Sequence, residues 1–91
     1  MITFKKSFPH ADSSRFKHIA RYDAKVGLFF VGAEDNGEGW WNWWVALAEQ
    51  GPAPGDHAIY ESGGDESWEV AQASIEQVLR EVANTILKEL S

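Results

Sequence analysis

The spacing of hydrophobic and polar positions changes near residue 67, where a helical period begins. Ser67 is suited to cap a helix, and Glu69 follows in the first turn, where the helix dipole favours a carboxylate. Polar residues fill the side opposite the recurring apolar positions, which are Val70, Ala71, Ile75, Val78, Leu79, Val82, Ala83, Ile86, Leu87 and Leu90. This pattern predicts a C-terminal amphipathic helix over residues 67–90.

The predicted helix is longer than the strands that it would cover. About 23 helical residues span roughly 35 Å, whereas a strand of about eight residues spans only about 26 Å. We therefore expect the last apolar residues to project past the sheet, where they are available to a second subunit. The residues of this possible dimer contact are Ile86, Leu87 and Leu90.

Before residue 67 the pattern favours strands. Residues 15–22 alternate and predict a strand, with His18 on a half-buried face. Asp23 and Ala24 would form a short turn, and residues 25–33 are apolar on both sides, as in an inner strand. These two segments predict a hairpin, and residues 57–62 predict a further strand.

The segment G-W-W-N-W-W-V-A-L, residues 39–47, holds four tryptophans in five positions. Its periodicity fits either a helix or a strand, but Trp and Val favour strands and glycine-containing segments flank it. As a strand it would turn Trp41 and Trp43 toward the helix, and Trp40, Asn42 and Trp44 toward the other face.

Three interpretations of that second face are open. It is a partner-binding surface, with Trp40 and Trp44 as anchors beside Asn42 and with a rim of acidic loop residues, Glu34, Asp35 and Glu38. Alternatively, the N-terminal segment folds over Trp40 and Trp44 and covers them with Ile2, Phe4 and Phe8. The third interpretation is an aromatic pocket for a small ligand.

Together these elements predict an α+β fold, an antiparallel sheet of three to five strands with one long C-terminal amphipathic helix packed on one face. The 91 residues predict a single domain with one compact core. Its expected parts are an N-terminal strand or irregular segment (1–14), an antiparallel meander (15–62) and the C-terminal helix (67–90).

Charge is unevenly distributed along the chain, whose net charge is −6. Residues 1–25 carry six Lys or Arg against two Asp, whereas residues 26–79 carry ten carboxylates and no Lys or Arg. Either the basic part folds against the acidic block and neutralises it, or the protein has an acidic face that attracts a basic partner. The chain has no cysteine and no apolar run of membrane-spanning length, so we expect a cytoplasmic protein without membrane insertion.

No motif for catalysis, metal binding or cofactor binding stands out. His10, His18 and His57 have no metal-ligand spacing, and the acidic loop over residues 34–39 lacks the spacing of a calcium loop. Lysines and arginines near the N-terminus are interleaved with phenylalanines, as in single-strand nucleic-acid binding, but the acidic remainder opposes it. We expect no enzyme activity, no metal, no cofactor and no direct nucleic-acid binding.

The order of strand, glycine-containing turn and strand, followed by S-W-E-V-A-Q-A at the start of an amphipathic helix, resembles HicB-like antitoxin domains and many short phage proteins. The resemblance covers about residues 26–87 at the level of pattern, and it implies no particular site.

The sequence thus predicts a small, acidic, non-enzymatic inhibitor that binds another protein. The expected class is an immunity protein, an antitoxin or a phage anti-defence protein of the anti-CRISPR type. Its partner would be a basic protein such as a nuclease or a nucleic-acid-binding complex, because an acidic face fits a phosphate-binding groove. The alternatives are a small-ligand-binding domain and a structural homodimerisation module.

Overall fold

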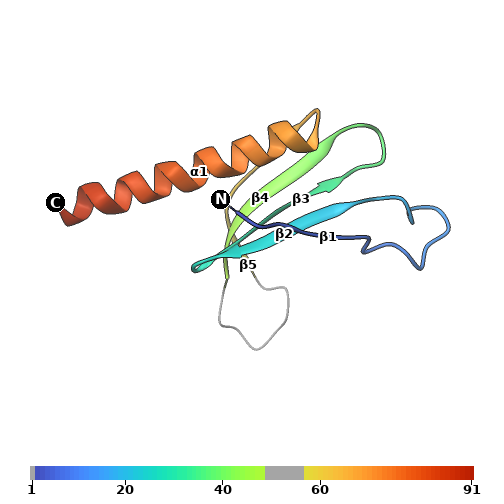
Figure 1. Ribbon diagram of the computed structural model, residues 1–91, viewed down its shortest axis with the longest axis horizontal. Coiled ribbons are helices and arrows are strands. Elements are labelled where there is room, and N and C mark those ends of the chain that lie inside the picture. The colour runs from blue at the N-terminus through green and yellow to red at the C-terminus, as the bar shows by residue number, and fades with distance from the viewer. Residues whose placement is uncertain (1, 49–56) are drawn as a thin grey trace.

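The computed structural model describes residues 2–48 and 57–91, and it has the predicted α+β architecture (Figure 1). Antiparallel strands form one sheet in sequence order: β1 (Lys5–Ser7), β2 (Arg21–Val26), β3 (Phe29–Asp35), β4 (Trp41–Ala48) and β5 (His57–Asp65). The helix α1 (Trp68–Leu90) packs on one face of this sheet. We call the sheet face opposite α1 the open face. The predicted antiparallel sheet with one C-terminal helix is confirmed.

The hydrophobic core lies between α1 and the middle strands. Ala24 pairs with Val31, and Val31 pairs with Val45, so these three side chains form one row across β2, β3 and β4. The helix covers this row with its buried residues, Ala71, Ile75 and Val78. Alternation along the strands therefore sends one set of side chains to the core and leaves the other set on the open face.

The turn between β2 and β3 is not where the sequence placed it. Asp23 and Ala24, the predicted turn, lie in the middle of β2, because Ala24 is needed in the core row. The chain reverses at Gly27 and Leu28 instead. Gly27 has a φ of 59°, whereas Leu28 does not have a positive φ, which is the pattern of a two-residue type II′ turn. Residues 25–33 consequently belong to two strands, and the prediction of one inner strand is wrong.

The predicted strand over residues 15–22 is also wrong, except for its last two residues. Residues 8–20 form irregular turns with local backbone hydrogen bonds, such as Ile19 N to the Phe16 oxygen at 3.0 Å. Ile19 is buried in this segment, whereas Phe16 and His18 are exposed. His18 therefore does not lie on a half-buried strand face. The meander of strands begins earlier than residue 15, because β1 pairs with β2.

The tryptophan-rich segment forms strand β4 from Trp41 onward, and Trp40 directly precedes it, so the strand interpretation of residues 40–48 is confirmed except at Trp40. β5 extends to Asp65, beyond its predicted end at residue 62. A register shift between Val45 and Ala46 makes Glu61 pair with Val45 and Ile59 pair with Ala46. Tyr60 is the extra residue of this β-bulge.

The helix begins and ends close to the predicted residues. Ser67 is its N-cap, and the Ser67 hydroxyl accepts a hydrogen bond from the Val70 backbone N–H at 3.2 Å. Glu69 lies in the first turn and Lys88 in the last, so both charges are favourable to the helix dipole. The predicted helix over residues 67–90 is confirmed.

Replacing Ser67 with alanine should lower the free energy of unfolding by about 1 kcal/mol, because the Val70 N–H would lose its capping acceptor. The measurement is urea denaturation followed by circular dichroism. Ser14→Ala is the control, since Ser14 is exposed in the irregular segment. Equal stability of the two variants would contradict the capping role.

Candidate functional site

The tryptophans of β4 divide between the two faces of the sheet as predicted. Trp41 and Trp43 lie on the helix side and pack against the core. The ring centroids of Trp41 and Trp68 are 5.8 Å apart. The Trp68 ring also stacks on the Tyr22 ring, with a centroid distance of 4.1 Å and an interplanar angle of 7°. Phe4 completes this aromatic cluster, because its ring is perpendicular to that of Trp68 with the two centroids 4.8 Å apart. Two of the four tryptophans of the segment therefore stabilise the fold.

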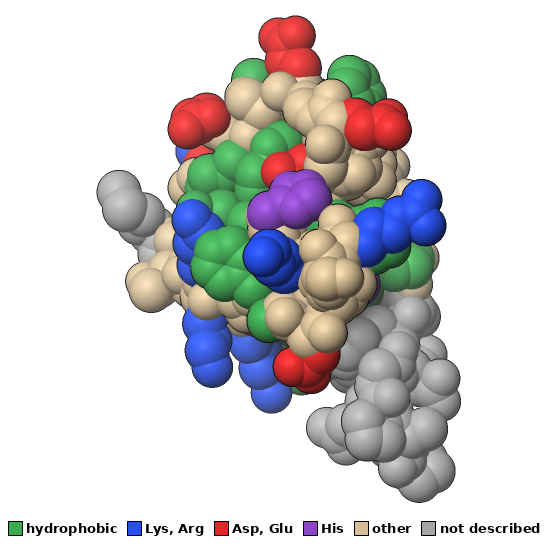
Figure 2. All heavy atoms as spheres, turned by 90° about the vertical axis from the view of Figure 1, so that its right-hand side faces the viewer, with side chains coloured by type: hydrophobic (Ala, Val, Ile, Leu, Met, Phe, Trp, Pro, Cys, Tyr) green, Lys and Arg blue, Asp and Glu red, His purple; other side chains and the backbone are tan. Residues whose placement is uncertain are grey.

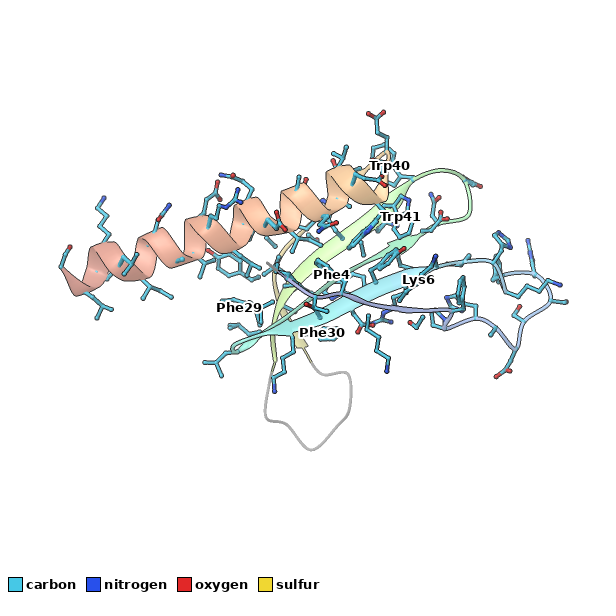
Figure 3. The ribbon with its side chains drawn as sticks, viewed as in Figure 1. Phe4, Lys6, Phe29, Phe30, Trp40 and Trp41 are labelled. Carbon is cyan, nitrogen blue, oxygen red and sulfur yellow. The ribbon has the colours of Figure 1, made fainter. Side chains whose placement is uncertain are left out.

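The N-terminal segment does not cover the other two tryptophans. Ile2 and Phe4 pack against the core on the helix side, and Phe8 is exposed beside Lys6. The prediction that Ile2, Phe4 and Phe8 fold over Trp40 and Trp44 is therefore wrong. Trp40 keeps 45% of its surface exposed and lies at the end of the sheet where α1 begins (Figure 3).

Trp44 lies on the open face and is bound to a cation of its own chain. The Arg21 guanidinium is 4.9 Å from the centroid of the Trp44 ring and 6.0 Å from that of Phe30. Asp23 Oδ2 is 3.5 Å from Arg21 Nε. The Trp44 ring extends across Gly32, where a Cβ would lie 2.5 Å from its Cζ2 atom. This contact shows that an indole of the open face binds a guanidinium in this protein.

The indoles of Trp43 and Trp40 lie on opposite faces of the edge strand β5. Trp43 lies over Gly63 on the helix side, where a Cβ would be 2.7 Å from its Cζ2 atom. Trp40 lies over Gly64 on the open face, where a Cβ would meet its Nε1 atom. Both rings reach the edge of the sheet because these two positions have no side chain. We call Trp40, Trp43, Gly63 and Gly64 the indole edge.

A groove about 400 Å³ in volume lies beside the indole edge, between β5 and α1. Its apolar part includes Trp43, Val70 and Val78, and Glu61 and Glu81 stand at its sides. Gln77 Nε2 donates a hydrogen bond of 3.2 Å to Glu81 Oε1. A second groove, about 420 Å³ in volume, lies on the other side of α1.

Opposite charges lie at opposite edges of the sheet. β1 and β2 carry Lys5, Lys6, Arg21 and Lys25, whereas β5, the turn after it and α1 carry the carboxylates that we call the acidic edge: Glu61, Asp65, Glu66, Glu69 and Glu81. β3 and β4 separate these two groups. In Figure 2 most acidic side chains lie at the top, and Lys and Arg side chains lie across the middle and lower part.

Intramolecular ion pairs do not neutralise the acidic edge. Within residues 2–48 and 57–91, the ion pairs are His10 with Glu34 at 2.8 Å and Arg21 with Asp23 at 3.5 Å. Asp65 accepts a hydrogen bond from the Ser74 hydroxyl at 2.7 Å. The carboxylates of the acidic edge are thus left without a cationic partner in the described part of the chain.

The structure brings together four of the six residues predicted to bind a partner. Trp40, Asn42, Trp44 and Glu34 share the open face, and Asn42 pairs with Glu34 across the strands. Asp35 pairs with Trp41 on the helix side, and its Oδ1 atom accepts the Gly37 N–H at 2.8 Å. Glu38 is exposed in the loop. The Asn36 side chain organises this loop by accepting the N–H groups of Glu38 and Trp40.

Sequence reasoning did not identify Glu61, Gly63, Gly64 and Glu81 as parts of a site. The sequence carried a signal for Gly63 and Gly64, because two adjacent glycines in a strand indicate a close approach of other groups to its backbone. The partners of those glycines depended on the strand register, which the sequence did not provide.

Among the described side chains, His10 and His18 are not brought together with further metal ligands. His10 bonds to Glu34, His18 is exposed, and no group of three or more His, Asp or Glu side chains in residues 2–48 and 57–91 could hold a metal ion. The described part of the chain also has no helix with the length and hydrophobicity that crossing a membrane requires.

Comparisons with known proteins found no family model that matches this chain, and no similar curated protein or solved structure.

Proposed function

We propose that this chain is a non-enzymatic binding protein that docks on a basic, nucleic-acid-binding protein and blocks its phosphate-binding surface. The observation that carries the proposal is the indole edge, where Trp40 and Trp43 flank Gly64 and Gly63 beside the carboxylates of the acidic edge. Aromatic faces next to carboxylates suit the recognition of arginine and lysine, which such partners present in excess. The proposal places the chain with immunity proteins, antitoxins and phage anti-defence proteins.

The geometry of β5 supports an extended basic segment as the contacting part of the partner. β5 ends the sheet, so one side of its backbone has no strand partner in the described part of the chain. A segment that added to this edge would have its alternate side chains near Trp43 and Glu61 on one face and near Trp40 on the other. The contact between Arg21 and Trp44 is an internal example of the guanidinium binding that we propose for Trp40.

The electrostatic part of the proposal rests on the separation of charges. A basic surface approaching the acidic edge meets carboxylates that have no cationic partner among residues 2–48 and 57–91, so attraction is strong at long range. Salt should weaken such a complex mainly by slowing its association. The neighbouring apolar groove adds contact area that salt does not affect.

The first test uses a dye-labelled peptide with alternating arginine and valine, of the same length as β5, 9 residues. We expect its dissociation constant to rise when salt increases from about 0.1 M to about 1 M. Trp40→Ala should raise the dissociation constant by about tenfold or more, as expected for an anchoring tryptophan. Fluorescence anisotropy of the peptide gives these constants.

Matched controls separate this site from general attraction between opposite charges. Phe16→Ala removes another exposed aromatic residue, and Glu89→Gln removes another exposed carboxylate, so both should bind as the parent does. Glu61→Gln should weaken binding by a few-fold. Binding of a peptide with glutamate in place of arginine at the same affinity would refute the site, as would equal effects of Trp40→Ala and Phe16→Ala.

The test of inhibition requires a protein partner in place of the peptide. Proteins retained from a bacterial lysate by the parent chain, but not by Trp40→Ala, are identified and purified. We expect them to be basic and to bind labelled duplex DNA or RNA, and we expect this chain to displace that nucleic acid. If nucleic acid and this chain bound the partner simultaneously without affecting each other, the inhibitor function would be wrong even though binding occurred.

A further inference from the structure

The C-terminal part of α1 extends beyond the sheet with an uncovered apolar stripe. The residues of α1 that are buried in the core, Ala71, Ile75 and Val78, all lie in its first half. Figure 1 shows the second half projecting away from the strands. Three large apolar side chains of this projecting end are mostly exposed: Ile86 (52%), Leu87 (65%) and Leu90 (79%). This confirms the predicted overhang of the helix.

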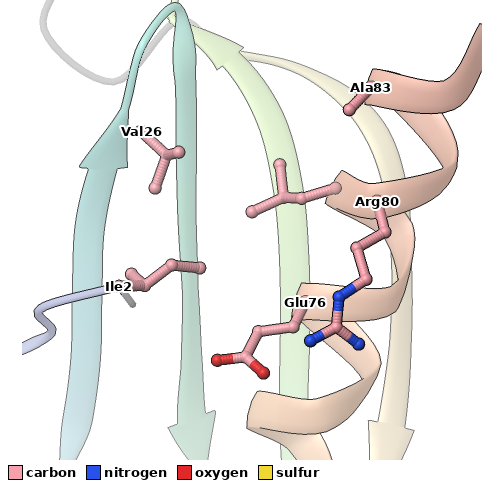
Figure 4. Close-up of a pocket in the computed structure, with 6 residues that line it drawn as sticks. Ile2, Val26, Glu76, Arg80 and Ala83 are labelled. Carbon is pink, nitrogen blue, oxygen red and sulfur yellow. The ribbon is translucent and has the colours of Figure 1, made fainter.

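The larger of the two grooves lies next to this projecting end. It is about 420 Å³ in volume and open to the surface (Figure 4). Ile2, Val26, Leu79 and Ala83 form its apolar lining, and Glu76 and Arg80 complete it. Because Leu79 and Ala83 are one turn apart and Ile86 and Leu90 continue the same side of the helix, groove and projecting stripe form one continuous surface.

We propose that this surface is a homodimer interface, in which the projecting helix end of each copy occupies the groove of the other. A twofold axis requires a patch that is complementary to itself, and this one has a protruding part and a hollow part on the same side of one helix. Two antiparallel helices that cross between residues 84 and 85 have matching positions. Leu79 faces Leu90 of the partner subunit, Val82 faces Leu87 of the partner subunit, and Ala83 faces Ile86 of the partner subunit.

The charge distribution favours a second copy over the basic partner at this surface. Glu76 and Glu89 are balanced by Arg80 and Lys88, and Glu81 stands at the other groove, so this surface is neutral, although the whole chain has a net charge of −6. Two copies can meet there with little repulsion, whereas the acidic edges of two copies would repel each other. A neutral apolar end also offers no electrostatic attraction to a basic protein.

The first test is sedimentation equilibrium of the full chain from about 1 μM to about 1 mM, the range of a weak dimer of one helix pair. The mass should rise from 10.2 kDa toward twice that value. Leu87→Asp and Leu90→Asp should stay monomeric at concentrations where the parent is dimeric. Their thermal stability at low concentration should match the parent, because both side chains are exposed in the monomer.

Phe8→Asp is the matched control, since Phe8 is an exposed apolar residue outside the proposed interface. It should dimerise as the parent does. A parent chain that remained monomeric throughout, or Leu87→Asp and Leu90→Asp variants that both dimerised normally, would overturn the proposal.

Distances between spin labels on the two copies test whether the helices pair antiparallel. The chain has no cysteine, so one spin label can be attached at Ala73→Cys or at Glu89→Cys. The proposed crossing separates the two copies of residue 89 by about 14 Å along the helix axis and the two copies of residue 73 by about 35 Å, at 1.5 Å per residue. Electron-electron double resonance should find the larger distance at residue 73. Equal distances at both positions would exclude the antiparallel interface.

Discussion

Replacing Ile75 with alanine is expected to lower the free energy of unfolding by about 2–5 kcal/mol. Ile75 is 0% exposed and is the largest fully buried side chain of the helix. It covers the row of Ala24, Val31 and Val45, whose small and branched side chains cannot fill the cavity left behind. Because a small domain has only about 5–15 kcal/mol of stability in total, this one change should remove a large part of it.

Urea denaturation of the Ile75→Ala variant, followed by circular dichroism, measures this loss. Ile59→Ala is the matched control, because Ile59 is 58% exposed on β5 and the same atoms are removed. We expect the control to lose less than about 1 kcal/mol. If the two variants were equally stable, α1 would not pack on the sheet as described.

Replacing Gly32 with alanine should cost about 1–3 kcal/mol or more, because there is no space for the added methyl group. A Cβ at this position would lie 2.5 Å from Trp44 Cζ2 and 2.6 Å from the backbone oxygen of Tyr22. The Trp44 ring could only move by leaving Arg21, and the Tyr22 oxygen belongs to the neighbouring strand. The sheet itself would therefore have to deform.

Gly64→Ala is the informative comparison for Gly32→Ala. The three atoms nearest the new methyl group would all belong to the indole of Trp40, which is partly exposed and has solvent to move into. Both substitutions lower the conformational entropy of the unfolded chain by similar amounts. The difference between the two thermal midpoints therefore reports how each substitution affects the folded state. We expect the larger loss for Gly32→Ala, and a shifted tryptophan emission for Gly64→Ala. A Gly32→Ala variant as stable as Gly64→Ala would contradict the packing of Trp44 on β3.

Local sequence patterns were sufficient to predict the helix and the faces of β4. The apolar stripe of α1 continues without interruption from Val70 to Leu90, and Ser67 supplies an unambiguous cap. In β4 the assignment of faces follows from the period of two alone, so Trp41 and Trp43 had to lie opposite Trp40 and Trp44 once the segment was a strand. These features depend on neighbouring residues only.

The first hairpin shows where local pattern failed. Residues 15–22 alternate, but alternation does not ensure that a second strand is available. Residues 15–18 form turns instead, Ile19 N–H bonds locally to the Phe16 oxygen, and the Ala20 oxygen accepts the Asp35 N–H of β3 at 3.0 Å. Gly27 was treated as part of an apolar strand, although a glycine that can adopt a positive φ is the usual first residue of a type II′ turn. The position of that turn sets the pairing of Ala24 with Val31, and so decides which side chains enter the core.

The candidate site was only half predictable for a similar reason. Trp40 could be assigned to the open face from the alternation of the segment that follows it, but its position over Gly64 depends on how β5 pairs with β4. That register includes a bulge at Tyr60, which moves every later residue of β5 by one position. Trp43 and Glu61 come together only through this pairing, so neither the indole edge nor its groove follows from composition or periodicity.

The separation of charge between the two edges of the sheet gives the molecule an electric dipole moment, so the molecule orients in an electric field. Lys5, Lys6, Arg21 and Lys25 lie on β1 and β2, and the carboxylates of the acidic edge lie on β5, the turn after it and α1. A charged surface therefore exerts a torque on the molecule before any contact, over about 10 Å at 0.1 M salt. In front of a positive surface the molecule turns until β5 faces that surface.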